Sequence, residues 1–74
     1  MIVYRRLLKR EDIANLEDYE ELIYYKDNNI AYVINKMVNN NNYVIRKKKI
    51  FNNQLMEEAF FKLPEQIVQS LYKN

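Results

Sequence analysis

A run of four consecutive cations, Arg46, Lys47, Lys48 and Lys49, is the part of this chain best suited to chemistry with an anion. Guanidinium and ammonium groups neutralise phosphates, so such a run is typical of a nucleic-acid contact. If the run lies on a β-strand, its first and third cations point to one face and its second and fourth to the other. The run then has a second interpretation, as an edge strand whose lysines prevent edge-to-edge aggregation.

Other cations join this run in space only if the fold brings them together. They are Arg5, Arg6, Lys9, Arg10 and Lys36. The formal net charge is only +2, which does not by itself predict nucleic-acid binding. A nucleic-acid site is therefore an alternative hypothesis, and its candidate residues are Arg5, Arg6, Lys36, Arg46, Lys47, Lys48 and Lys49.

Four tyrosines fall on segments that we expect to be strands: Tyr24, Tyr25, Tyr32 and Tyr43. Aromatic side chains on a sheet are first of all good cross-strand packing residues. On a sheet face that no helix covers, they would instead serve a protein interface or stack on bases. These tyrosines are the candidate partner-binding residues.

Catalysis and metal binding are not expected. The chain has no histidine and no cysteine, and its single serine, Ser70, has no base beside it in sequence. The acidic residues at positions 11–21 match no calcium loop, and the chain has no glycine for the sharp turn of such a loop. We therefore expect a protein that is not an enzyme, with no catalytic residues, no cofactor and no metal. The acidic segment is read as a solvated helix face or as a contact for a basic partner.

The composition favours a particular kind of gene. The six amino acids with AT-rich codons, Phe, Tyr, Met, Ile, Asn and Lys, account for 40 of the 74 residues. We infer an AT-rich genome, in which so short a reading frame is typical of a phage or mobile element.

Length and hydropathy suggest a single small domain spanning residues 1–74. A chain this short buries a thin core, so a homodimer or a partner-bound form is plausible. No segment approaches the roughly 18 apolar residues of a membrane span, and the N-terminal apolar stretch is too short for a signal peptide. We expect no membrane association and a cytoplasmic location, in the host cell if the gene belongs to a phage.

Asparagine takes the place of glycine at the expected turns, because it is the next residue to tolerate a positive φ. Asparagines at 28–29 and 39–42 separate segments rich in β-branched and aromatic residues, and we interpret both as turns. The segments are residues 22–26, 30–38 and 43–51, which together predict a three-stranded antiparallel meander.

The remaining segments are expected to be helical. Residues 11–20 carry apolar side chains at near-helical spacing, whereas residues 2–8 are either the start of that helix or a separate strand. A helical stripe follows Asn52, which we interpret as an N-cap with Phe51 and Met56 as a hydrophobic staple. Its members are Leu55, Met56, Ala59, Phe60 and Leu63. Pro64 suits the first turn of a further helix. The predicted fold is α+β, in the order α-β-β-β-α-α, with helices on one face of the sheet.

The segments "YYKDNNIAYVINK", "YVIRKKKIF" and "NNQLMEEAF" together resemble the arm-site DNA-binding domains of phage integrases over about half the chain. That resemblance implies a sheet laid into the major groove. The α-β-β-β-α order is also similar to double-stranded-RNA-binding domains, although their basic cluster begins the final helix and this one lies in the last expected strand. In class and size the chain is similar to phage anti-CRISPR inhibitors.

Two function hypotheses follow. The first is a non-enzymatic phage or mobile-element accessory protein, an anti-defence inhibitor that binds a host protein or nucleoprotein complex. The second is a small DNA- or RNA-binding regulator that uses the basic third strand. A third possibility is a structural protein that forms a homodimer through the C-terminal stripe.

Overall fold

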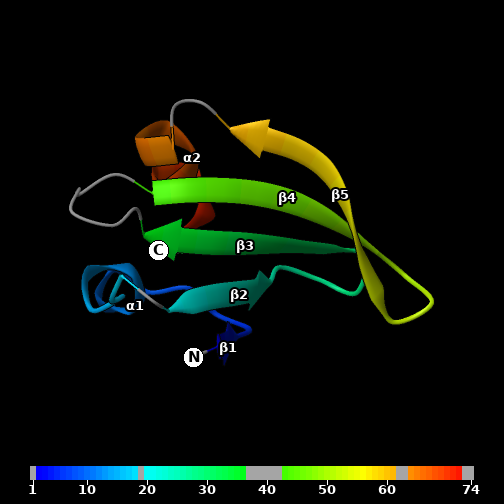
Figure 1. Ribbon diagram of the computed structural model, residues 1–74, viewed down its shortest axis with the longest axis horizontal. Helices are drawn as coiled ribbons and strands as arrows, with labels where there is room; N and C mark the ends of the chain where they lie inside the picture. The colour runs from blue at the N-terminus through cyan, green and yellow to red at the C-terminus, as the bar shows by residue number, and fades with distance from the viewer. Residues whose placement is uncertain (1, 19, 37–42, 62–63, 73–74) are drawn as a thin grey trace.

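The computed structural model describes residues 2–18, 20–36, 43–61 and 64–72. Its elements, in chain order, are β1 (Ile2–Arg5), α1 (Arg10–Ala14), β2 (Glu21–Tyr25), β3 (Ile30–Lys36), β4 (Tyr43–Phe51), β5 (Gln54–Phe61) and α2 (Pro64–Leu71). The strands form one five-stranded sheet in the order β1-β2-β3-β4-β5. β1 is parallel to β2, and the other neighbours are antiparallel, so the sheet is mixed (Figure 1).

The predicted fold, a three-stranded sheet with three helices, is therefore wrong. Across the described ranges the structure has five strands, one short helix early in the chain and one late. The errors concern the two edge strands. β1 forms where the sequence allows either a strand or a helix, and β5 forms where the sequence predicts a helix. The three central strands, β2, β3 and β4, lie where the alternating segments predict them.

β5 was predicted as a helix because the asparagine pair before it and the spacing of its apolar residues both resemble those of a helix. Asn52 and Asn53 have φ of 51° and 62°, so they do not cap a helix. Two successive positive φ values make the two-residue turn that matches strand twist, and the pair joins β4 to β5 as a hairpin. The register also shifts between Lys47 and Lys48, which leaves an extra residue in β5. This bulge moves the apolar residues out of strict alternation, and the result imitates helical spacing. The expected staple is wrong for the same reason, because Met56 lies in a strand and there is no helix start for Phe51 to stabilise.

The N-terminal third contains a strand and one helical turn. Residues 2–5 form β1, which answers the question left open between strand and helix. The helix expected over residues 11–20 is only Arg10–Ala14. The Asp12 carboxylate accepts a hydrogen bond from the backbone N–H of Lys9 at 2.9 Å, which satisfies one free donor at the start of this turn. A helix this short has little stability of its own, so the buried Ile13 beneath it holds it in place.

The remaining turns differ in how they are made. Between β2 and β3, the Asp27 carboxylate accepts the backbone N–H groups of Asn29 and Ile30 at 2.8 and 2.9 Å. This turn confirms the predicted hairpin, but an aspartate side chain closes it rather than a left-handed asparagine. α2 begins at Pro64, as predicted. The turn expected at 39–42 lies outside the described residues.

Both helices pack on the same face of the sheet. In register across that face lie Val3, Leu22, Ile34, Ile45 and Phe61. Leu8, Ile13 and Leu16 from the α1 region, and Val68 and Leu71 from α2, complete this core cluster. The other face holds a separate cluster centred on Ile23, Ala31 and Val33, to which no residue of the described helices contributes. We call this second face the open face. No helix in the described part of the chain is long and apolar enough to cross a bilayer.

Candidate functional site

A row of side chains in register crosses all five strands on the open face. Its members are Tyr4, Ile23, Val33, Arg46 and Phe60. The two central residues are buried, whereas Tyr4 and Phe60 at the ends are 55% and 57% exposed. The row therefore has a buried apolar centre, with an exposed aromatic residue at each edge of the sheet and the exposed Arg46 paired with Phe60. Exposed aromatic residues are enriched where proteins contact one another.

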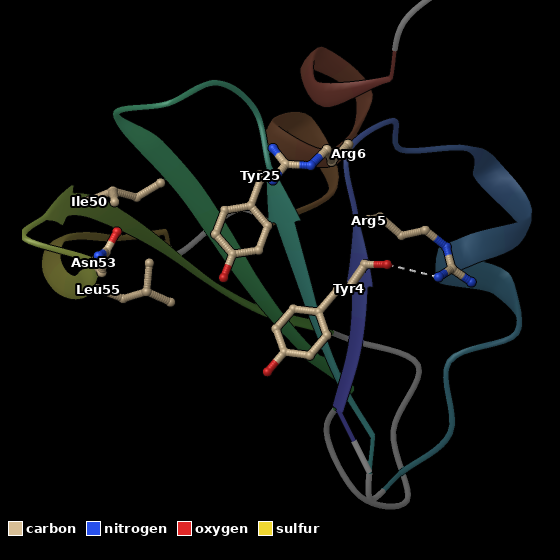
Figure 2. Close-up of a pocket in the computed structure, with 7 residues that line it drawn as sticks. All are labelled: Tyr4, Arg5, Arg6, Tyr25, Ile50, Asn53 and Leu55. Carbon is tan, nitrogen blue, oxygen red and sulfur yellow. Dashed lines mark hydrogen bonds between the residues drawn. The ribbon is translucent and has the colours of Figure 1, made fainter.

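A cleft of about 630 Å³ lies at one end of the open face. It is lined by Tyr4, Arg5, Arg6, Tyr25, Ile50, Asn53 and Leu55, and we call it the tyrosine cleft. Figure 1 shows that the β4–β5 hairpin projects beyond the end of β3. Ile50 and Leu55 from this hairpin pack, with Tyr25, against the open-face cluster. Figure 2 shows the hairpin residues on one side of the cleft and the two tyrosines on the other.

The two tyrosines of the cleft form a near-parallel pair. Their ring centroids are 6.2 Å apart and the planes differ by 16°. The Arg6 guanidinium lies 5.6 Å from the centroid of the Tyr25 ring, a cation–π contact. Arg5 points away, because its guanidinium binds the Asp12 carboxylate at 3.0 Å and the Tyr4 carbonyl at 2.9 Å (Figure 2). Arg6 is therefore the residue whose guanidinium can bind a ligand in the cleft.

The four tyrosines proposed from the sequence do not share a surface. Tyr24 and Tyr32 are buried in the core beneath the helices, with rings stacked at 6.4 Å, and Tyr43 packs on the same side. They act as the cross-strand packing residues that sheets favour. Tyr25 belongs to the open face and lines the tyrosine cleft. Alternation along β2 separates Tyr24 from Tyr25, although they are neighbours in sequence.

Two carboxylates of β5 form ion pairs with three of the four cations of the basic run. Glu57 lies 3.7 Å from Arg46 and 3.4 Å from Lys48, and Glu58 lies 3.6 Å from Lys47. The alternation predicted for the run is confirmed, because Arg46 and Lys48 follow the open-face register while Lys47 pairs across the other face. Surface ion pairs of this kind add little stability, but the two carboxylates offset two of the four positive charges and so weaken the local field that attracts phosphates.

Removing the Glu57 and Glu58 carboxylates should leave the cations of the basic run free to bind phosphates. For Glu57→Gln with Glu58→Gln we expect about a tenfold gain in affinity for a duplex oligonucleotide at low salt, since each released cation adds about 0.9 to the salt slope. Fluorescence anisotropy across a salt series measures both quantities. Glu11→Gln with Glu65→Gln changes the net charge equally at two exposed sites on the helices, and should leave affinity nearly unchanged. Equal gains in both variants would contradict local shielding.

The remaining candidate cations are dispersed. Lys36 lies 3.7 Å from Asp18, and Arg10 lies over the Tyr72 ring at 4.9 Å. Burial raises the pKa of Tyr72 above its ordinary value, and the nearby Arg10 charge partly opposes that rise. None of the four cations at positions 46–49 lines the tyrosine cleft. The structure does not bring Arg6, Arg10 or Lys36 to the basic run in the described part of the chain, so the condition for a shared basic surface is not met there.

Sequence reasoning missed Tyr4 and Phe60, the exposed ends of the row. Tyr4 lies in "IVYR", whose apolar and aromatic residues were a signal for a strand. Phe60 belongs to the predicted helical stripe, and a helix there gives no reason to expect its pairing with Arg46 on the neighbouring strand. Ile50 reaches the cleft through the pairing of β3 with β4, where its N–H donates to the Asn29 carbonyl at 2.8 Å, and the turn at 52–53 adds Asn53 and Leu55.

Side chains for catalysis or metal binding are not brought together among the described residues. The Ser70 hydroxyl donates to the carbonyl of Ile67 at 2.7 Å, a bond within α2. No group of three acidic side chains in the part of the chain that the structure describes could hold a metal ion. The open face and its cleft present aromatic rings, aliphatic side chains and guanidinium groups.

No protein-family model, curated protein or solved structure matches this chain.

Proposed function

We propose that this chain is a non-enzymatic binding protein that contacts a protein partner through its open face. The row that joins the exposed Tyr4 and Phe60 rings carries this proposal. Tyrosine and arginine are the side chains that most often dominate binding at protein interfaces, and aromatic residues are enriched there. In this row Arg46 lies beside Phe60, and the buried Ile23 and Val33 support the surface from the centre of the sheet.

A protein partner is favoured over a nucleic-acid backbone because of the charge balance. Glu57 and Glu58 lie within ion-pair distance of three of the four cations on β4. A phosphate backbone would have to compete with these carboxylates, whereas a protein surface can use the aromatic rings directly. The DNA- or RNA-binding regulator predicted from the basic third strand is the weaker candidate.

The role as a phage-encoded inhibitor of a host protein or nucleoprotein complex stays a prediction. An inhibitor that covers a surface needs no nucleophile, acid or base, which agrees with the lack of histidine and cysteine. Of the four tyrosines first considered, Tyr25 is retained as a contact residue because it belongs to the open face.

Two residues of β5 provide a matched test. Phe60 pairs with Arg46 on the open face, whereas Met56 pairs with Lys49 on the opposite face and is 54% exposed. A photo-crosslinking amino acid at position 60 should capture a protein from lysate of the cells that carry the gene, and the capture should survive nuclease treatment. The same group at position 56 should capture little of that protein.

Substitutions complete the test. Phe60→Ser should weaken affinity for the captured partner about thirtyfold or more, because truncating an aromatic residue that dominates an interface costs about 2 kcal/mol or more. Met56→Ser should change affinity less than about threefold if it lies outside the contact. Calorimetry with the purified partner measures both. Equal loss for the two variants, or capture that nuclease abolishes, would contradict a protein contact through the open face.

A further inference from the structure

The tyrosine cleft is positively charged. Arg6 contributes its guanidinium at 5.6 Å from the Tyr25 ring, and no acidic residue of the described chain lines the cleft. Arg5 differs, because Asp12 already binds its guanidinium. No ion pair of Arg6 is found among the described residues. The charge of the cleft therefore suits an anionic ligand.

Flat aromatic surface lies next to that charge. Tyr4 is 55% exposed, and its ring is nearly parallel to the Tyr25 ring. Such a surface binds other planar rings, and stacking on tyrosine is tolerant of which base is bound. Ile50 and Leu55 supply an apolar wall across the cleft, and Asn53 adds a carboxamide to its lining (Figure 2). A carboxamide can both donate to and accept from the edge of a base.

From this juxtaposition we propose that the tyrosine cleft binds a nucleotide unit, with the base against the tyrosine rings and the phosphate at Arg6. The cleft volume of about 630 Å³ falls within the range of small-ligand sites. The unit is either a free mononucleotide or one nucleotide of a single strand, which share this chemistry. A duplex is excluded as a ligand because its bases are stacked inside the helix and their faces are not accessible. This site goes beyond the proposed protein contact and involves none of the four cations on β4.

The test uses the purified native chain and four probes. They are thymidine monophosphate, a short single-stranded oligothymidylate, a duplex of the same length and inorganic phosphate. Tyrosine is the natural fluorophore, because the chain has no tryptophan. Stacking should quench its fluorescence, and titration calorimetry gives the affinity. We expect saturable binding of the monophosphate or the oligothymidylate, and at least about tenfold weaker binding of the duplex.

Two pairs of variants locate the site. Arg6→Gln should weaken binding about tenfold, whereas Lys49→Gln, which removes an exposed cation elsewhere, should change it less than about twofold. Tyr4→Leu should lower the quenching by ligand stacking, because only the Tyr25 ring of the pair remains, and Phe51→Leu, at an exposed ring outside the cleft, should leave the quenching unchanged. All four positions are exposed, so circular dichroism should show native folding in each variant.

Each outcome of this experiment either supports or overturns the proposed nucleotide site. Binding of the monophosphate identifies a free nucleotide as the ligand, and binding of the oligothymidylate alone identifies a single strand; either supports the proposal. Equal binding of inorganic phosphate and monophosphate, equal binding of the duplex, equal loss in Arg6→Gln and Lys49→Gln, or no saturable binding would overturn it. The protein contact is tested separately at Phe60, so either proposal can fail while the other stands.

Discussion

Replacing Tyr24 with alanine should lower the free energy of unfolding by about 3–5 kcal/mol, the range for large aromatic residues removed from a core. Tyr24 is buried, stacks on Tyr32 across the β2–β3 pair and packs in the cluster beneath the helices. A loss of this size removes most of the stability of a small domain, whose total is typically 5–15 kcal/mol. Urea unfolding followed by circular dichroism measures the change.

Tyr24→Phe is the matched control, since it keeps the ring and removes only the hydroxyl. We expect this variant to stay folded and to lose less than about 1.5 kcal/mol, as volume-conserving core changes do. The pair distinguishes a packing residue from a contact residue. A Tyr24→Ala chain that unfolds at the same urea concentration as the native chain would argue that Tyr24 is exposed and would return it to the candidate contact surface.

Leu8→Ala should destabilise the protein by about 2–5 kcal/mol, whereas Leu7→Ala should cost less than about 0.5 kcal/mol. The two leucines are adjacent and chemically identical, but Leu8 is 1% exposed and Leu7 is 48% exposed. Leu8 joins the core cluster between β1 and α1, so its removal leaves a cavity there. Thermal and urea unfolding of the two variants in parallel give the difference.

This comparison also tests the path of the chain after β1. If residues 2–8 were the first turns of a helix with Leu7 inward, the order of the two effects would reverse. Similar losses for both leucines would mean that neither side chain is selectively buried, and would contradict the packing of this segment against the sheet.

The central strands could be predicted because their signals are local. β2 and β3 are short runs of β-branched and aromatic residues, and the segment between them contains the Asp27 that closes the turn. β1 could not be predicted with the same certainty, because its partner is the parallel β2 beyond α1. A four-residue strand has too few residues to show a period, and its assignment depends on a pairing distant in sequence.

β5 was missed for a different reason. The bulge between Lys47 and Lys48 puts Leu55 and Phe60 on the same face although they are an odd number of residues apart. The apolar residues of β5 therefore do not alternate with a period of two, and their spacing fits a helix better than it fits the strand that they form. Asn52 and Asn53 have positive φ, as expected of asparagines at a turn in a chain without glycine, so this pair is a turn like the asparagines at 28–29 rather than a helix cap.

The candidate site was only partly predictable. Alternation determines that Tyr24 and Tyr25 face opposite sides of the sheet, but it does not say which side the helices cover. That choice depends on the apolar stripes of two distant segments that join one core cluster. The pairing of Arg46 with Glu57 could not be foreseen either, because it exists only if β5 is a strand.

Strand order in the sheet is the same as strand order along the chain, and this has a consequence for folding kinetics. Three of the four strand pairs join consecutive antiparallel strands, so their formation requires little loop-closure entropy. Low sequence separation between contacting residues favours rapid folding. The nucleus is expected in the central meander, with β1 and β5 added at its margins. Because Tyr4 and Phe60 lie on those two marginal strands, local fraying there would abolish binding before the domain unfolds as a whole.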